Sequence, residues 1–262
     1  MKRIIGRKQQ TDNAKWLEAM AIIEKLVSRN ELNEAVATVC KDIKKVTKGK
    51  NIAYAWSGGK DALVLGDICE KLGISRCVFV HTELEYPAFL SWCMEHLPEG
   101  CEVINTGQNL DWLAKHPAML FPDNSSIVSR WFAIVQRRGI RQYFLKHGLD
   151  MILVGHRKAD GNFVGKGSNI LTNGAGVTRY SPLAEWPHEL VLAYIHYNNI
   201  PLPPIYGWKD GFRCGTHPWP ARSGMKSIDE GWADIYDIDP SIIEVAAAKI
   251  ESAAHFLKEV RS

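Results

Sequence analysis

A strand-like run, a glycine-rich turn and a helix-like pattern follow one another directly between residues 51 and 73. Residues 51–56 (NIAYAW) are apolar enough for a buried strand, and residues 61–73 (DALVLGDICEKLG) have the spacing of a helix that a glycine closes. The turn between them, residues 57–61, reads Ser-Gly-Gly-Lys-Asp. Such a junction gathers backbone N–H groups, a helix N-terminus and an ammonium around one concavity, which suits an anionic phosphate.

The same alternation of strand and helix continues along the chain. Further strands are predicted over 76–82, 101–106 and 150–156, and further helices over 87–97 and 127–148. This order is typical of an α/β fold with a parallel sheet and crossover helices. Such sheets bind ligands at the carboxyl ends of their strands, which is where the glycine turn lies.

The two ends of the chain do not follow this alternation of strand and helix. Helical periodicity over residues 12–48 predicts two helices before the first strand. Beyond residue 160 the chain is rich in glycine, proline and tryptophan, with one helix expected over 187–199 and a final helix over 240–260 that packs on the sheet. We therefore expect an N-terminal helical extension, a nucleotide-binding domain and a C-terminal helical segment packed on that domain, over residues 1–50, 51–222 and 223–262.

Composition excludes several classes of protein. The net charge is only +3 over 262 residues, so bulk charge does not indicate a polyanion-binding protein. No apolar stretch approaches the roughly 18 residues that cross a bilayer, and the N-terminus lacks the apolar core of a signal peptide, which predicts a cytoplasmic protein without a membrane partner. The six cysteines form no C-x-x-C pair, so reduced thiols are expected.

Several separated segments resemble a known family. Residues 57–62 (SGGKDA) resemble the Ser-Gly-Gly-Lys-Asp-Ser signature of the PP-loop pyrophosphatases, or adenine nucleotide alpha hydrolases. Within that superfamily, residues 51–222 are most similar to the phosphoadenosine phosphosulfate (PAPS) reductase family. The resemblance also rests on 78–87 (VFVHTELEYP), 130–144 (RWFAIVQRRGIRQYF), 152–161 (ILVGHRKADG) and the proline- and tryptophan-containing stretch 180–213.

The resemblance implies a three-layer α/β PP-loop fold that binds ATP or a related adenine nucleotide together with Mg²⁺. The residues that it places against the nucleotide are Ser57, Gly58, Gly59, Lys60, Asp61, Ala62, His81, Thr82, Glu83, Gly155 and Arg157. It implies catalytic roles for Lys60, Asp61 and Arg157, and Mg²⁺ ligation by Asp61 with Glu83.

Four positions depart from the family pattern. Ala62 replaces the last serine of the signature, which removes one hydrogen bond to phosphate worth about 1.5–3 kcal/mol. His81 replaces an aspartate that would help to hold Mg²⁺, and either Glu83 or Glu85 could substitute for it. Thr216 and Trp219 occupy the positions of a cysteine pair that holds a metal or iron–sulfur cluster in many relatives, so no iron–sulfur cluster is expected.

Cys214 has two interpretations. The segment Cys-Gly-Thr-His that it begins imitates the nucleophilic motif of true PAPS reductases, which would make Cys214 a thiolate nucleophile. That motif belongs near the C-terminus, however, and relatives carry a serine or threonine at this position. We favour the second interpretation, in which Cys214 is a small packing residue.

The function that these observations favour is an enzyme that cleaves an adenine nucleotide at its α-phosphate, with pyrophosphatase, adenylating or sulfur-transfer chemistry. The acceptor is expected to be a nucleic acid or a sulfate-bearing substrate, and self-association is compatible with this expectation. One alternative is PAPS reduction by Cys214. Another is a nucleotide- or nucleic-acid-binding protein that has lost catalysis, which the substitutions at Ala62 and His81 motivate.

Overall fold

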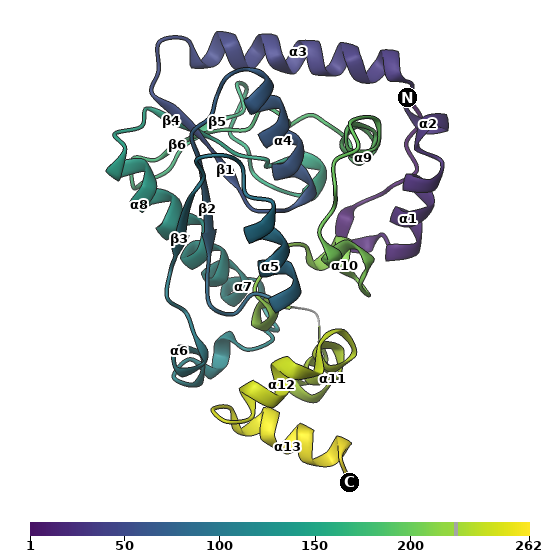
Figure 1. The fold of residues 1–262 in the computed structure, drawn as a ribbon, viewed down its shortest axis with the longest axis vertical. Coiled ribbons are helices and arrows are strands. Elements are labelled where there is room, and N and C mark those ends of the chain that lie inside the picture. The colour runs from purple at the N-terminus through teal and green to yellow at the C-terminus, as the bar shows by residue number, and fades with distance from the viewer. Residues whose placement is uncertain (223–224) are drawn as a thin grey trace.

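A computed structural model describes residues 1–222 and 225–262, and its centre is a six-stranded sheet (Figure 1). The strands are β1 (Ile52–Trp56), β2 (Cys77–His81), β3 (Glu102–Asn105), β4 (Met151–Leu153), β5 (Ile170–Thr172) and β6 (Thr178–Tyr180). Their order across the sheet is β3-β2-β1-β4-β6-β5, with β5 antiparallel to β6 and the other pairs parallel. The predicted α/β class with a mainly parallel sheet is confirmed.

Helices cover both faces of the sheet, which gives three layers (Figure 1). One face carries α4 (Lys60–Lys71), α5 (Pro87–Glu95) and α9 (His188–Tyr197), and the other carries α8 (Gly139–Lys146). Because side chains alternate along a strand, Ala53 of β1 is buried with the α8 side chains, whereas the next residue, Tyr54, is buried in the larger core on the opposite face. The sheet is thus buried on both sides, as parallel sheets require.

The strand order reverses between β1 and β4. From β1 the chain steps outward to β2 and β3, and it then returns to place β4 on the other side of β1. The loops that follow β1 and β4 meet at this point, and the region between them, called the crevice here, is where such sheets bind ligands. The glycine turn at residues 57–59 and the loop at residues 154–157 border this crevice.

Three helices, rather than the predicted two, precede the sheet: α1 (Asn13–Ala21), α2 (Ile23–Leu26) and α3 (Arg29–Thr47). Asp12 caps α1 through the amide of Lys15, and Ser28 begins α3 with a capping box to Glu31. The additional break lies at Ile22, which leaves helical geometry and has no helix-breaking neighbour that the sequence would reveal.

The region between β3 and β6 contains elements that the sequence pattern did not predict. These are the short helix α6 (Leu110–Ala114) and the β5–β6 hairpin, which lies in a stretch expected to be irregular. The predicted long helix is divided into α7 (Ser125–Phe132), a π-helical stretch (Ala133–Arg138) and α8. Short 3₁₀ turns occur at Lys8–Gln10, Pro117–Met119, Lys158–Asp160, Pro204–Gly207 and Trp219–Ala221.

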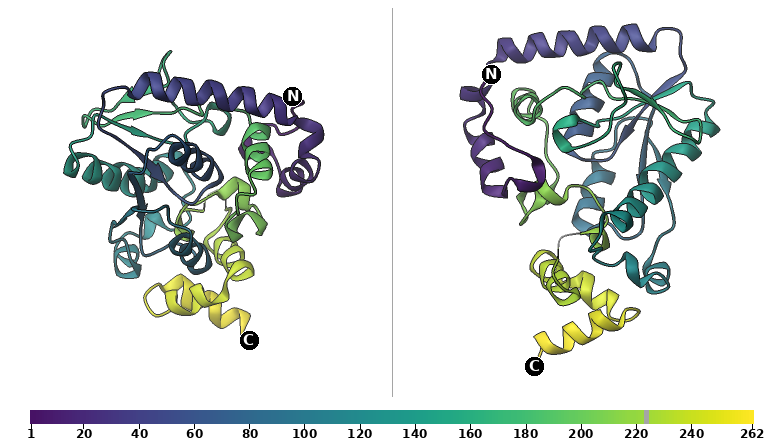
Figure 2. Two further views of the ribbon diagram at one scale, coloured as in Figure 1. Left: turned by 45° about the horizontal axis from the view of Figure 1, so that its top comes forward. Right: turned by 180° about the vertical axis from the view of Figure 1, so that it is seen from behind.

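The prediction of a single final helix packed on the sheet was wrong in both the number of helices and their position. After the short α10 (Gly211–Cys214), the chain forms α11 (Ile228–Ile238), α12 (Pro240–Ala246) and α13 (Glu251–Val260). These three helices pack on one another beyond the edge of the sheet, not on its face (Figures 1 and 2). Trp232 joins them to the rest of the molecule through an edge-to-face contact with Phe121, with ring centroids 5.0 Å apart. Within the described residues, no helix has the length and apolar character that crossing a bilayer requires.

Candidate active site

The glycine turn forms a tight junction between β1 and α4. Gly58 has a φ of +67°, and a Cβ on it would lie 2.5 Å from the Sγ atom of Cys93, so this position accepts only glycine. Gly59 precedes the first residue of α4, and it has no side chain with which to cap this helix. The N-terminus of α4 therefore leaves backbone N–H groups facing the crevice, which favours an anion.

A later segment covers the turn. The Lys60 amide donates to the Tyr206 hydroxyl at 2.7 Å, and a Cβ on Gly59 would lie 3.1 Å from a methyl carbon of Thr216. Burial raises the pKa of Tyr206, so its hydroxyl stays protonated. Thr216 thus packs against the turn, while Trp219, the other residue in a cluster-cysteine position, is buried 5.7 Å from Trp232.

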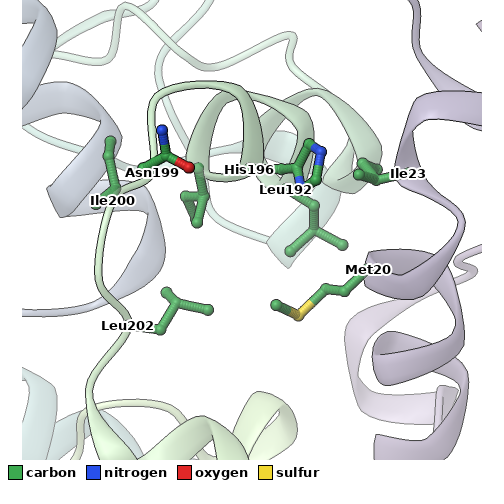
Figure 3. Close-up of a pocket in the computed structure, with 8 residues that line it drawn as sticks. Met20, Ile23, Leu192, His196, Asn199, Ile200 and Leu202 are labelled. Atoms are coloured by element: carbon green, nitrogen blue, oxygen red, sulfur yellow. The ribbon is translucent and has the colours of Figure 1, made fainter.

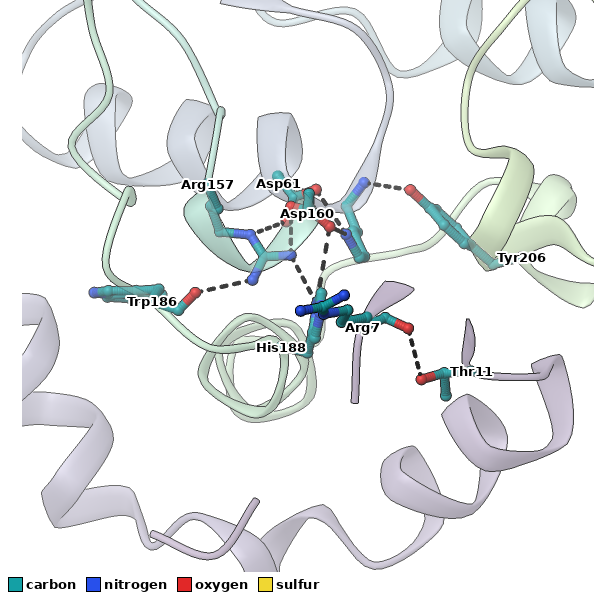
Figure 4. Close-up of polar contacts among 9 residues, drawn as sticks. Arg7, Thr11, Asp61, Arg157, Asp160, Trp186, His188 and Tyr206 are labelled. Atoms are coloured by element: carbon teal, nitrogen blue, oxygen red, sulfur yellow. Dashed lines mark hydrogen bonds and ion pairs between the residues drawn. The ribbon is translucent and has the colours of Figure 1, made fainter. Parts of the chain in front are cut away.

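Behind the turn, Arg157 organises a buried charge network (Figure 4). Its guanidinium, which is fully buried, pairs through Nε with Asp61 at 2.7 Å and through Nη2 with Asp160 at 2.8 Å. It also donates to the Trp186 carbonyl at 3.0 Å and lies 3.1 Å from Nδ1 of His188. Arg157 therefore joins the loop after β4 to the first turn of α4 across the crevice.

Lys60 completes the network rather than pointing into solvent. Only 2% of its surface is exposed, and its ammonium pairs with Asp61 at 2.7 Å and with Asp160 at 3.6 Å. The ammonium also lies 5.5 Å from the centre of the Trp16 ring, which comes from α1. Two cations thus alternate with two carboxylates in the interior.

This arrangement decides the charge state of two groups. Burial acts to raise the pKa of Asp61, but the charges of Arg157 and Lys60 outweigh it and hold the pKa well below its usual range. Burial, followed by the same two positive charges, lowers the pKa of His188 to about 4, so its ring is neutral at pH 7. Because Arg157 can only donate, Nδ1 of His188 is the acceptor and its proton resides on Nε2.

The end of β2 carries the second group of predicted nucleotide-binding residues. His81 and Thr82 are buried, and the amide and hydroxyl of Thr82 both donate to the carboxylate of Glu85, at 2.8–3.0 Å. Glu83 is exposed and accepts from the Asn105 amide at 3.1 Å. Glu85, an alternative Mg²⁺ ligand in the sequence analysis, thus holds this loop in place.

The remaining predicted residues border the turn itself. Ser57 is half-buried, and Ala62 is buried in the first turn of α4. Gly155 lies where a Cβ would approach the Asp61 carbonyl within 3.0 Å, so the loop after β4 packs directly on the start of α4. The structure therefore brings Lys60, Asp61, Gly155 and Arg157 together at one point.

The described residues do not fit a Mg²⁺ site in this arrangement. Both carboxylate oxygens of Asp61 are paired with cations, and the carboxylate of Glu83 is bonded to Asn105. Among residues 1–222 and 225–262, no three acidic, histidine or cysteine side chains are grouped as metal ligands would be. No step proposed below depends on Mg²⁺.

Cys214 lies at the end of α10, close to several charged groups. Burial raises the pKa of its thiol, and the opposing charges of Arg222 and Arg213 do not overcome that effect. A nucleophilic thiolate requires a lowered pKa. The environment of Cys214 therefore favours the thiol form.

Four residues of the site were missed by sequence reasoning: Trp16, Asp160, His188 and Tyr206. Asp160 follows Arg157 by three residues in the segment GHRKADG, and this spacing was the only signal available. The other three come from α1, α9 and the 3₁₀ turn at Pro204–Gly207, so only the folded chain brings them to the crevice.

Two cavities lie away from the turn. One, of about 450 Å³, is bordered by α1, α9 and the segment after α9, with Met20, Leu192 and Leu202 among its lining residues (Figure 3). The other, of about 460 Å³, lies beside α4 and α5 and is lined by Trp56, Asp67 and other residues.

One solved structure shows a similar fold. The chain is similar to phosphoadenylyl-sulfate (PAPS) reductase from Candida auris in a phosphate complex, with a TM-score of 0.50 and 18% identity over 70% of this chain and 94% of that chain. It is also similar to NH3-dependent NAD synthetase from Campylobacter jejuni in complex with nitrate, with a TM-score of 0.45 and 16% identity over 86% and 96% of the two chains. A comparison with curated proteins found no match. The fold is that of an α/β protein with a mainly parallel sheet, which the PAPS reductase structure shares.

Within this class the family is also established. Residues 51–214, well over half of the chain, match the family described as the phosphoadenosine phosphosulfate reductase domain. The chain belongs to the PAPS reductase family, which confirms the resemblance seen in its sequence.

Proposed function

We propose that this protein binds ATP or a related adenine nucleotide with its phosphates on residues 57–61 and cleaves it at the α-phosphate. The observation that carries the proposal is the glycine turn at the point where strand order reverses, followed by a helix whose N-cap residue is a glycine without a capping side chain. The family match supports an adenine nucleotide as the ligand.

The chemistry is a displacement at phosphorus. An oxygen nucleophile, from water or from an acceptor, forms a bond to the α-phosphorus while the bond to the bridging oxygen breaks. Pyrophosphate leaves with the electron pair, and the proton of the nucleophile passes to solvent; with water the products are a nucleoside monophosphate and pyrophosphate. Amides at the start of α4 stabilise the charge on the leaving group.

Lys60 and Arg157 act mainly as positioning residues in this proposal. Their charges are matched by Asp61 and Asp160 in the interior, so their contribution is to hold the turn and the loop after β4 rigidly. Preorganised backbone donors need such support, because their catalytic value depends on a fixed position.

The test uses the purified chain with ATP, dATP or PAPS, with and without DNA or tRNA, and measures nucleotide binding, pyrophosphate and sulfite. Ser57→Ala should weaken nucleotide binding by about tenfold, because a hydrogen bond to a charged group is lost. Ser126→Ala is the matched control, since Ser126 is exposed on α7.

The outcomes separate the three functions. Pyrophosphate release that falls in Ser57→Ala but not in Ser126→Ala supports the proposal. Binding without turnover identifies a nucleotide-binding protein that has lost catalysis. Thiol-dependent sulfite formation from PAPS that disappears in Cys214→Ala identifies a reductase, an outcome that the raised pKa of Cys214 disfavours.

A further inference from the structure

The N-terminal strap, residues 1–12, is held beside the charge network. Near its start, the Ile5 amide donates to the buried carboxylate of Glu189 at 2.8 Å. Just after its end, the Asn13 side chain accepts from the Phe212 amide at 3.3 Å. Because the chain is anchored on either side, the 3₁₀ turn at Lys8–Gln10 has a defined position. Figure 4 shows the Thr11 hydroxyl donating to the Arg7 carbonyl within the strap, at 3.0 Å.

Lys8 reaches from this turn toward the cover of the phosphate site. Its ammonium lies 3.4 Å from the position that a Cβ on Gly215 would take. The next residue, Thr216, is the one that packs on Gly59 of the glycine turn. Lys8 is half-buried, and the groups whose charges act on it include Lys60 and Asp160. Its ammonium is therefore at the edge of the crevice.

The balance of charge leaves Lys8 without a counterion. Lys60 and Arg157 are matched by Asp61 and Asp160, two cations with two carboxylates. In the part of the chain that the structure describes, no ion pair engages Lys8. Burial, followed by the charge of Lys60, lowers the pKa of Lys8, which shows that this site opposes a positive charge in the free protein.

An ammonium in such a position gains a counterion when an anion binds next to it, so the binding of an anion there is favoured. The glycine turn and the start of α4 are the anion site nearest to the strap. We propose that Lys8 is a ligand of the phosphate end of the bound nucleotide, so that the N-terminal strap forms part of the binding site. This inference rests on the proposed function, and it adds to the turn a cation that lies outside residues 51–214.

The experiment compares Lys8→Met with Lys2→Met and Lys8→Arg in the full chain. Lys2 is an exposed lysine on the same strap and serves as the matched control. The dissociation constants for ATP and inorganic pyrophosphate are measured by calorimetry, with adenosine as the ligand that lacks phosphate. The melting temperature is measured with and without pyrophosphate.

We expect Lys8→Met to weaken ATP and pyrophosphate binding about tenfold or more, while the free protein melts at the same temperature as wild type or higher. Lys8→Arg should retain most of the affinity, and Lys2→Met should behave as wild type. Wild-type affinity for pyrophosphate in Lys8→Met overturns this inference alone. A fall in the melting temperature of free Lys8→Met together with weaker binding also overturns it, because Lys8 would then be structural. If wild type binds neither ATP nor pyrophosphate, the proposed function fails as well.

Discussion

Arg157 and Asp61 form a 2.7 Å ion pair that joins the loop after β4 to the first turn of α4. Arg157 is fully buried and also pairs with Asp160, so this one side chain bridges the crevice where the strand order reverses. Two loops that are about 100 residues apart in the chain are thereby fixed relative to one another. The proposed phosphate site depends on this bridge, because the glycine turn leads directly into Asp61.

Replacing Arg157 should therefore be costly to stability. Arg157→Ala leaves two carboxylates to share Lys60 as their remaining cation, and we expect the free energy of unfolding to fall by about 3–5 kcal/mol. The free energy of unfolding of Arg157→Lys should lie between those of Arg157→Ala and wild type, because one ammonium cannot reproduce the forked contacts of a guanidinium. Urea denaturation measures the effect. The control is Arg213→Ala, which removes an exposed pair with Asp210 and should cost about 1 kcal/mol or less. Equal losses in both alanine variants would contradict a bridging role.

Gly58 should not tolerate a side chain. Gly58→Ala places a Cβ near Cys93 and in a left-handed conformation, so we expect a loss of about 3 kcal/mol in unfolding free energy. Gly73→Ala has a similar φ of +77° but open space around its Cβ, and should lose about 1–2 kcal/mol. Adding Cys93→Ala to Gly58→Ala should recover part of the difference. If Gly58→Ala and Gly73→Ala cost the same, the close approach to Cys93 is not limiting.

The Tyr206 hydroxyl should compete with the ligand for the Lys60 amide. Tyr206→Phe leaves a buried N–H without a partner, so the free protein should lose about 1–3 kcal/mol of stability. A bound phosphate would satisfy this amide, and the rise in melting temperature caused by ATP should then be larger in Tyr206→Phe than in wild type. Tyr236→Phe is the control, since the Tyr236 hydroxyl makes no hydrogen bond within the described residues. A smaller ligand-induced shift in Tyr206→Phe would show that the hydroxyl itself contacts the nucleotide.

His188 should make stability depend on pH. Its pKa is about 4 in the folded protein against 6.5 for a free side chain, so the unfolded state takes up the proton first as pH falls. The stabilisation is complete above pH 6.5 and is lost between about pH 6.5 and 4, with a total of about 3 kcal/mol.

The variant His188→Asn isolates this contribution. Its amide oxygen can accept from Arg157 in place of Nδ1, but it does not titrate, so its stability should decline less steeply over this pH range. His255→Asn changes an exposed histidine and serves as the control. Chemical denaturation at several pH values gives the comparison. Superimposable pH profiles for wild type and His188→Asn would rule out His188 as the source.

Local patterns in the sequence were sufficient to predict the strands β1 to β4, the helices beside them and the glycine turn. These local patterns failed where the residues of a segment do not by themselves encode its structure. The β5–β6 hairpin lies in a glycine-rich stretch and is held by pairing with β4. Residues 247–250 contain neither glycine nor proline, yet the chain turns there so that Phe256 of α13 can pack against Tyr236.

The residues of the candidate site also divide into those that the sequence predicted and those that only the folded chain brings together. The sequence by itself determined that a glycine turn at residues 57–61 joins a strand to a helix, because all three are encoded within a few neighbouring residues. The position of Arg157 near this turn was predicted from its place at the end of a strand and from the family resemblance. Only the tertiary structure decided which side chains surround that turn. Asp160, His188, Tyr206 and Lys8 reach it from four separate segments, and Lys60 is drawn inward by two carboxylates. Contacts of this kind depend on how the layers pack, since buried charges lie wherever their partners are within reach.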